Sequence, residues 1–344
     1  MKLYEITLRP VSGFGTTLKG DTIFGHFCWQ VWHKPSLVEG GLKTLLSVYD
    51  HKPFVVFSSA FPKLNSPPGS YFLKRPDLPV SFFFHADGEK SCKERIVAEK
   101  EHRKKKWMVT EGELSLDLQK ASYLTDRESL VKFADRVSDE TRRQMRRLGP
   151  QKFINFFPQP HNTINRLTQT TGTGPFAPFS TENTYYYPET ELVVFVLIDG
   201  SASSLDSVLK ALENIGKWGY GRDASTGMGR FELGPSIEHP FPDTTGANAA
   251  YTLAPSVPQK DCFTASFFTA FVRFGKHGDR LARSENPFKN PVIMADEGAV
   301  FKPEDAATFF EKPYMGRAIT GVSKVRSDTV VQGYAPYLPL RLEG

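Results

Sequence analysis

The pattern of apolar and polar residues predicts that the chain begins with a strand, a loop and a helix. Residues 3–8 alternate between apolar and polar side chains, which is typical of a half-buried strand. A loop from Pro10 to Gly20 follows. The next apolar side chains recur on one face at helical spacing: Ile23, Phe24, Phe27, Cys28 and Val31. Asp21 precedes them, and we expect its carboxylate to cap this helix.

Similar patterns continue to residue 233, with a long interruption. They predict a short helix over residues 40–48, strands over 53–61 and 191–199, a helix over 203–218 and a strand over 230–233. Strand, helix, strand, insertion, strand, helix and strand is the order of a ferredoxin-like β-α-β-β-α-β domain with a large insertion. We therefore predict an α+β fold, with an N-terminal domain over residues 1–240.

The interruption contains two segments of unlike composition. In residues from about 87 to 152 the composition shifts: residues 90–107 are charged and predicted to be helical, and a basic cluster, RRQMRR, covers residues 142–147. They form either a solvated helix face or a basic edge of a nucleic-acid groove. Residues 160–176 are polar, rich in threonine and end in a Gly/Pro turn, which favours a projecting hairpin or loop. We expect a thumb-like hairpin over about residues 160–188.

A second set of elements follows a linker rich in Pro, Gly and Thr at residues 238–248. Strands are predicted over residues 250–253, 267–274 and 292–294, and residues 319–336 form a tail that is also predicted to be rich in β-structure. This pattern predicts a second, smaller α+β domain over residues 241–344.

Composition narrows the class of protein. The 344 residues carry a formal net charge of +5, which permits a nucleic-acid partner without requiring one. The 3 cysteines are far apart and form no CxxC pair, so neither a disulfide framework nor a zinc site is expected. We find neither a signal-peptide core nor an apolar run of membrane-spanning length. We expect a cytoplasmic protein without a membrane partner.

The stretch WGYGRDASTGMGRFEL, residues 218–233, has the composition of a phosphate-binding loop. Its glycines alternate with charged and hydroxyl side chains: Gly219, Gly221, Arg222, Asp223, Ser225, Thr226, Gly227, Gly229 and Arg230. Such a loop can present backbone N–H groups to phosphates. It does not match the dinucleotide fingerprint, since Ala224 stands where the third glycine belongs, nor the P-loop. The alternative is a long turn that leads into a strand.

The sequence lacks the HExxH, GxSxG and EF-hand patterns and a Gly-Gly-Asp-Asp pair. Two histidines remain as candidates for catalysis. His26 lies among the apolar residues of the first helix, and His161 opens the segment HNTINR. Each fits a structural role or a phosphate contact as well as general base catalysis.

Four stretches together resemble the RAMP superfamily, in particular the fourth subunits of type III-A (Csm) CRISPR interference complexes. They are SGFGTTLKGDTIFGHFCW (residues 12–29), HNTINRLTQTTG (161–172), WGYGRDASTGMGRFE (218–232) and VVQGYAPYLPL (330–340). The basic region at 87–152 has no counterpart in this resemblance.

The resemblance implies two ferredoxin-like domains and a noncatalytic subunit without metal or cofactor. It implies binding of the repeat-derived 5′ tag of CRISPR RNA (crRNA), and contacts with the large polymerase-cyclase subunit and the first backbone subunit. In this interpretation residues 161–174 form a thumb that bends the RNA. The residues expected at the RNA are Thr16, Thr17, Lys19, His26, His161, Asn162, Asn165, Arg166, Thr168, Thr170, Gly219, Gly221, Arg222, Ser225, Thr226, Gly227, Gly229 and Arg230; Lys324 and Arg326 are weaker candidates.

Two alternatives stay open. The chain could be a metal-independent repeat-RNA endonuclease of the same superfamily that uses His26 or His161. Such nucleases carry their Gly-rich loop near the C-terminus, whereas here about a third of the chain follows it. The chain could also be an assembly protein that does not contact RNA.

Overall fold

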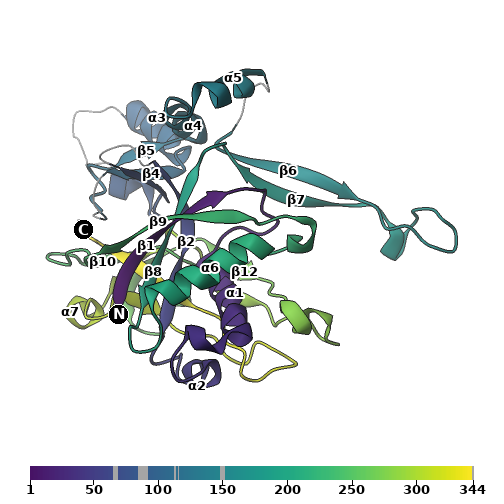
Figure 1. Cartoon of the computed structure of the whole chain (residues 1–344). Coiled ribbons are helices and arrows are strands. Elements are labelled where there is room, and N and C mark those ends of the chain that lie inside the picture. Colours follow the sequence, from purple (N-terminus) through teal and green to yellow (C-terminus); the bar gives the residue numbers. More distant parts are fainter. Residues whose placement is uncertain (65–68, 84–91, 112–113, 115, 148–151, 343–344) are drawn as a thin grey trace.

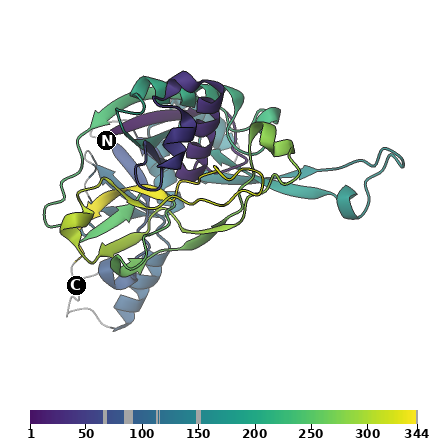
Figure 2. The same ribbon diagram turned by 90° about the horizontal axis from the view of Figure 1, so that it is seen from below.

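The computed structural model describes residues 1–64, 69–83, 92–111, 114, 116–147 and 152–342. Two β-sheets and their helices form the body, and one long hairpin projects from it (Figures 1 and 2). The fold is α+β, as the sequence predicts. Among the described residues, no helix is long and apolar enough to cross a membrane.

The first sheet has 7 strands in the order β5-β4-β3-β2-β8-β1-β9. Their bounds are β1 Lys2–Pro10, β2 Val55–Leu64, β3 Ser70–Lys74, β4 Trp107–Glu111, β5 Ser122–Leu124, β8 Glu191–Ile198 and β9 Phe231–His239. β8 pairs antiparallel with both β1 and β2, and β1 pairs antiparallel with β9. The predicted strand over 191–199 is therefore central, and its residues 192–198 are buried.

Two helices, α1 (Gly20–His33) and α6 (Leu205–Trp218), pack together on one face of this sheet (Figure 1). Ser204 caps α6 by accepting a hydrogen bond from the Ser207 N–H. The predicted cap of α1 is wrong, because the N-cap residue is Lys19 and Asp21 lies in the first turn. The Asp21 carboxylate instead binds the guanidinium of Arg273 at 2.6 and 2.8 Å.

The basic insertion contributes strands as well as helices. Helix α3 (Cys92–Arg103) precedes β4, and helices α4 (Asp126–Ala134) and α5 (Asp139–Arg147) follow β5. Phe72, Val109, Phe133 and Phe153 form a separate small core beneath this region. The helix predicted over residues 90–107 is present as α3, whereas α4, α5 and the strands β4 and β5, which extend the sheet, were not predicted. The ends of the predicted region, residues 87–91 and 148–151, lie outside the described residues.

The predicted hairpin consists of β6 (Ile154–His161) and β7 (Phe179–Tyr186), which pair antiparallel along their whole length. It extends away from the body, and its connecting loop is at the far end (Figures 1 and 2). At its root, Phe14 pairs with Thr184 through two backbone hydrogen bonds of 2.8 Å. The hairpin is thus anchored to the loop that follows β1.

The second sheet has 5 strands in the order β11-β14-β10-β16-β15. Their bounds are β10 Ala249–Thr252, β11 Phe263–Phe267, β14 Val300–Pro303, β15 Tyr314–Gly316 and β16 Tyr334–Leu340; β12 (Ala270–Arg273) and β13 (Val292–Ala295) form a separate ribbon. The remaining helices are short: α2 Leu42–Ser47, α7 Ala306–Phe309 and 3-10 turns at Pro35–Leu37, Val80–Phe83, Gly174–Phe176, Ala224–Thr226 and Asp279–Arg283.

The predicted β-rich tail over residues 319–336 is mostly irregular, and a regular strand begins only at Tyr334. Part of the reason is the side chain of Gln332, which is fully buried. Its amide accepts a hydrogen bond from the Phe57 N–H at 3.0 Å and donates to the Phe57 carbonyl at 2.7 Å. The tail therefore connects to β2 through a side chain where a strand would have used its backbone.

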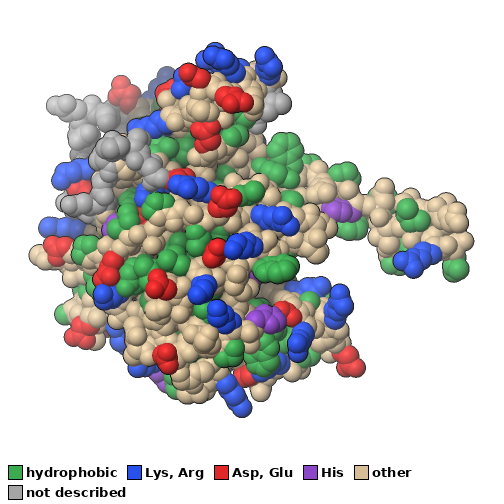
Figure 3. Space-filling model, in the orientation of Figure 1, with side chains coloured by type: hydrophobic (Ala, Val, Ile, Leu, Met, Phe, Trp, Pro, Cys, Tyr) green, Lys and Arg blue, Asp and Glu red, His purple; other side chains and the backbone are tan. Residues whose placement is uncertain are grey.

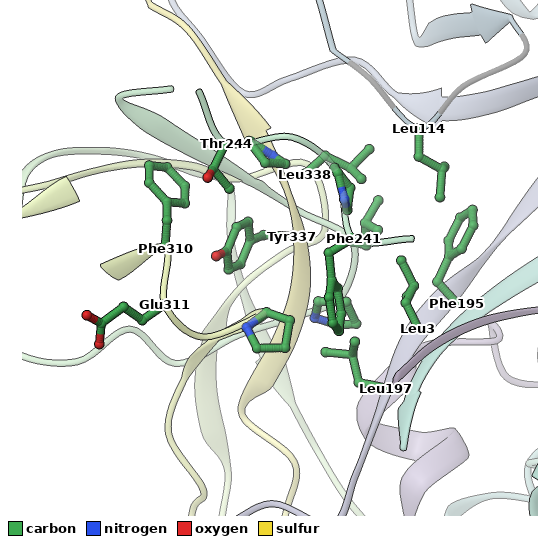
Figure 4. Close-up of a pocket in the computed structure, with 15 residues that line it drawn as sticks. Leu3, Leu114, Phe195, Leu197, Phe241, Thr244, Phe310, Glu311, Tyr337 and Leu338 are labelled. Carbon is green, nitrogen blue, oxygen red and sulfur yellow. The ribbon is translucent and has the colours of Figure 1, made fainter. Parts of the chain in front are cut away.

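One hydrophobic core runs through both sheets, and β16 packs against β2 and β8. An apolar cavity of about 230 Å³ remains between them, beside Leu3, Phe195, Phe241 and Leu338 (Figure 4). Leu3 lies at the start of β1, so the cavity is at the opposite end of this strand from the Gly-rich loop.

Candidate nucleic-acid interface

The Gly-rich loop and the loop after β1 leave the first sheet side by side. Pro10, the last residue of β1, pairs with Phe231, the first residue of β9. The loop of residues 11–19 therefore begins where the loop of residues 219–230 ends. Both loops thus lie at the same end of the paired strands β1 and β9.

Six hydrogen bonds join the two loops, and two of them run from the Val11 and Ser12 N–H groups to the Arg230 carbonyl. The Tyr220 hydroxyl donates to the Thr17 carbonyl at 3.0 Å, and the Arg222 N–H donates to Thr16 Oγ1 at 3.0 Å. The Gly229 N–H donates to the Gly13 carbonyl at 2.7 Å, and the Arg230 N–H donates to Ser12 Oγ at 2.9 Å. The two loops are thus one connected backbone surface.

Two glycines of the Gly-rich loop allow close backbone approaches, Gly221 to the loop after β1 and Gly229 within its own loop. A Cβ atom at Gly221, where φ is +76°, would lie 2.6 Å from the Thr16 side chain. A Cβ atom at Gly229 would lie 2.1 Å from the Tyr220 carbonyl oxygen. Only glycine combines a positive φ with so short a distance to a neighbouring segment of the chain.

The predicted cradle of free N–H groups is largely wrong, because most of these groups donate hydrogen bonds within the protein. The residues whose N–H groups are occupied are Gly221, Arg222, Thr226, Gly227, Met228, Gly229 and Arg230. Sequence spacing could not reveal this, because the acceptors come from residues 12–26 as well as from the loop itself. The groups left to contact a ligand are mainly side chains.

His26 is one of these acceptors. Its Nε2 atom accepts the Gly221 N–H at 3.0 Å, and its ring packs against Tyr220 with centroids 4.8 Å apart. Burial lowers the pKa of His26 to about 4, so its ring is neutral at physiological pH. The residue is placed to hold the Gly-rich loop on α1.

Lys19 also differs from the expectation that it lies at the RNA. Its ammonium group lies between the carboxylates of Glu297, at 2.7 and 2.8 Å, and Asp296. Burial alone would lower the pKa of Lys19, but these carboxylates raise it, so the side chain is a paired cation. It joins the loop after β1 to the C-terminal part of the chain.

The exposed face of the paired loops carries Arg222, Ser225, Thr226 and Arg230. Arg222 also reaches the hairpin root, where its guanidinium donates to the Glu182 carbonyl at 2.6 Å. Trp218, at the end of α6, is 77% exposed beside the loop. Sequence analysis did not assign Trp218 to the site, although its position next to Gly219 was a usable signal. Cationic side chains and aromatic rings such as indole are the groups that bind the phosphates and bases of single-stranded nucleic acid.

The predicted residues of the hairpin tip form a separate group. The Nε2 atom of His161 lies 2.9 Å from Thr181 Oγ1, and its ring stacks on Phe179. Asn165 shapes the tip, since its side chain accepts the Leu167 N–H. The remaining predicted residues there are exposed: Asn162, Arg166, Thr168 and Thr170. The tip lies far from the Gly-rich loop, at the end of the hairpin (Figure 1).

The weaker candidates lie elsewhere. Arg326 is paired with Asp328 at 2.6 Å and lies over the ring of Trp32, near the end of α1 that is remote from the Gly-rich loop. Lys324 is exposed in the same tail. Figure 3 shows basic and acidic side chains interspersed over the body, with few charges along the hairpin. Among the described residues, this face shows no broad basic patch (Figure 3).

Comparison with known proteins extends these observations. No family model matches the sequence, and no curated protein matches it. Among solved structures, it is similar to a chain of the Csm1–Csm4 cassette in complex with pppApA, with 17% identity and a TM-score of 0.54 over 100% of this chain and 99% of that one. The cassette in complex with cA4 gives 16% identity, a TM-score of 0.55 and 100% of both chains.

A chain of the Csm3–Csm4 subcomplex of the type III-A CRISPR-Cas interference complex is also similar, with 11% identity, a TM-score of 0.54, and coverage of 99% of this chain and 100% of that one. The chain therefore shares, over its full length, the fold of these solved chains. Csm4 is the component that the two assemblies have in common. The resemblance carried by the four sequence stretches is confirmed at the level of the fold.

Proposed function

We propose that the chain is a noncatalytic, Csm4-like subunit of a type III-A CRISPR-Cas interference complex. It binds the 5′ repeat-derived tag of crRNA and anchors the large polymerase-cyclase subunit and the backbone filament. One observation carries the proposal: a chain with the full-length fold of such subunits presents an exposed arginine and tryptophan surface at the root of a projecting hairpin. The C-terminal position of the loop in repeat-processing nucleases argues for this role over the endonuclease alternative.

We also propose that the chain contains two ferredoxin-like units. The orders β9-β1-β8-β2 and β16-β10-β14-β11 both correspond to the 4-1-3-2 strand order of a ferredoxin-like sheet. Helices α1 and α6 complete the first unit. In the second unit, among the described residues, only the four-residue helix α7 lies between β14 and β16, so this unit is a reduced form of the same fold.

In this proposal side chains, rather than free backbone N–H groups, make the contacts with RNA. Arg230 and Arg222 neutralise phosphates, Ser225 and Thr226 offer hydroxyl groups, and Trp218 stacks on a base. The bonded N–H groups of the loop hold these side chains in register. The hairpin extends from the same edge and contacts the RNA where tag and guide meet.

A noncatalytic role agrees with the state of the two histidines. A general base must reach the hydroxyl that it deprotonates. His26 is half-buried, and its Nε2 atom is occupied by the Gly221 N–H. His161 stacks on Phe179 far out on the hairpin. The endonuclease alternative predicts metal-independent cleavage of repeat RNA that is lost in H26A or H161A, and such cleavage would overturn the proposal.

Arg230→Ala tests the RNA contact. We expect it to weaken tag binding about tenfold, the equivalent of one charge-assisted contact. The slope of log K against log salt should fall by about 0.7, since one phosphate contact in a single strand is lost. The measurement is a titration of labelled tag RNA at several salt concentrations. Lys210→Ala, an exposed cation on α6, is the matched control and should bind like the wild type. Unchanged affinity and slope in R230A would contradict the assignment of this loop.

A further inference from the structure

The ribbon of β12 and β13 has two faces of opposite character. Residues 270–276 alternate strictly between exposed and half-buried side chains. β12 pairs antiparallel with β13, and a bridge between Lys276 and Phe288 continues the ribbon beyond them. Side chains two residues apart on such a strand point to the same side.

The inner face fixes the ribbon to the body. Arg273 binds the buried Asp21 carboxylate through two hydrogen bonds of 2.6 and 2.8 Å. The Lys19 ammonium lies 4.9 Å from the centre of the Phe271 ring. Both partners belong to the start of α1 or the residue before it. The ribbon is therefore held rigidly, and its outer face has a fixed orientation.

The outer face is apolar and exposed. Val272 and Ile293 are directly opposite each other in the ribbon and are 43% and 70% exposed. Phe274 is 75% exposed and Phe288 is 64% exposed, and both continue this strip. Clusters of exposed apolar side chains on soluble proteins mark interaction sites.

The end of the strip is basic. Lys276 lies 5.5 Å over the Phe288 ring, and Arg280 and Arg283 lie in the adjoining 3-10 turn. Of the acidic residues in this turn and beside it, Asp279 is paired with His33, which leaves Glu285. The apolar strip thus has an excess of positive charge at one end.

We propose that this strip, Val272, Phe274, Phe288 and Ile293, is a docking surface for a second protein subunit whose contact face has an apolar centre bordered by Asp or Glu side chains. The inference rests on the proposed function, which places the chain in a multi-subunit complex. A protein fits better than RNA because Val272 and Ile293 have no ring on which a base could stack. The basic end supplies charge complementarity to an acidic border.

The experiment uses the V272T/I293T double variant, which keeps β-branched side chains while removing apolar surface. Wild-type and variant chains are each titrated against the immobilised large polymerase-cyclase subunit and against the first backbone subunit. We expect at least tenfold weaker binding to one of the two subunits, and unchanged binding of tag RNA. Ile237→Thr, at a 48% exposed position on β9, is the matched control and should bind like the wild type.

The other outcomes overturn the inference in distinguishable ways. Undiminished binding of V272T/I293T to both subunits, together with wild-type binding, refutes the docking surface and leaves the proposed function intact. Failure of the wild type to bind either subunit refutes both. Loss of RNA binding alone assigns the strip to nucleic acid. If the wild-type chain self-associates in sedimentation and V272T/I293T does not, while subunit binding is unchanged, the strip is assigned to contact with a second copy of the chain.

A second variant guards against a folding defect in the first. R280E/R283E lies outside the paired strands and should leave the melting temperature unchanged. It should slow association with the same subunit at low salt, because complementary charges steer the encounter. Identical association rates for R280E/R283E and the wild type would contradict the proposed acidic border.

Discussion

At the residue scale, two glycines of the same loop have different surroundings. Gly221 has a φ of +76° and lies against Thr16, whereas Gly227 has a φ of +94° and has open space where a Cβ atom would lie. A side chain at either position strains the backbone, but only at Gly221 does it also collide with a neighbour.

This contrast gives a prediction. Gly221→Ala should destabilise the protein by about 2–4 kcal/mol, the combined cost of a left-handed alanine and an overpacked contact. Gly227→Ala should cost about 1–2 kcal/mol, from the backbone alone. Urea denaturation of the two variants measures the difference. Equal losses would show that the two loops move apart easily.

His26 gives a second prediction, in the pH dependence of stability. Burial lowers the pKa of His26 in the folded state to about 4, whereas an unfolded histidine has a pKa of about 6.5. The unfolded chain therefore binds a proton first as the pH falls. The stabilising contribution of neutral His26 is complete above pH 6.5 and is lost as the pH falls to about 4.

His26→Gln tests this dependence, since a glutamine oxygen can accept the Gly221 N–H without titrating. We expect near wild-type stability at pH 7 and a loss between pH 6.5 and 4 that is smaller than that of the wild type, by up to about 3 kcal/mol. His26→Ala, which leaves the N–H without its acceptor, should lose about 1–3 kcal/mol at pH 7. The free energy of unfolding at each pH is the measurement. Parallel pH profiles for H26Q and the wild type would exclude His26 as the titrating group.

At the scale of elements, the hairpin is an extension with its own pairing. β6 and β7 pair from Ile154↔Tyr186 to His161↔Phe179, and the side chains beyond this last pair are mostly exposed. Leu167, in the connecting loop, is 94% exposed. The tip therefore contributes little to the core.

Replacing residues 162–178 with an Asn-Gly turn tests this separation. Two residues of this type favour a tight hairpin, so β6 and β7 should remain paired. We expect a melting temperature within about 2 °C of the wild type, since exposed residues contribute little to stability. Affinity for isolated tag RNA should persist, while RNA that spans tag and guide should bind less tightly. A collapse of tag binding would show that the tip, rather than the Gly-rich loop, holds the tag.

At the scale of the whole molecule, ion pairs join the N-terminal part of the chain, near residue 20, to residues 273–297. Asp21, with a side chain 2% exposed, binds Arg273, and Lys19 binds Glu297 and Asp296. These pairs hold the loop after β1 and the start of α1 against the ribbon and the segment before β14. The same residues thus position both the proposed RNA surface and the proposed docking strip.

A double-mutant cycle on Asp21 and Arg273 measures this junction. Arg273→Met alone should destabilise by about 3–5 kcal/mol, because it leaves a buried carboxylate without its partner. D21N/R273M should lose less than the sum of the single variants, since no charge then remains buried. Chemical denaturation of the four proteins gives the coupling free energy. Additive losses would mean that the two side chains do not stabilise each other.

Much of the first sheet could be predicted because its signals are local. The alternation at residues 3–8, the helical spacing over 203–218 and the apolar run at 191–199 each depend on neighbours within a few residues. The irregular tail at 319–333 could not be predicted, since β-propensity there is overridden by Gln332, whose amide bonds to Phe57, 275 residues away. Asp21 was misassigned for the same reason, because its partner Arg273 is 252 residues distant.

The sequence by itself determined the order of the main elements up to residue 233 and the projecting hairpin, whereas the tertiary structure decided the pairing of the Gly-rich loop with the loop after β1. Only the tertiary structure decided what the glycines do. The N–H groups of Gly221 and Gly229 donate to His26 and Gly13, and that of Gly227 donates within the loop, so N–H groups that composition suggested for phosphate are already bonded. The physical reason is that composition reports which groups a loop carries, while the approach of distant segments decides which of them stay free.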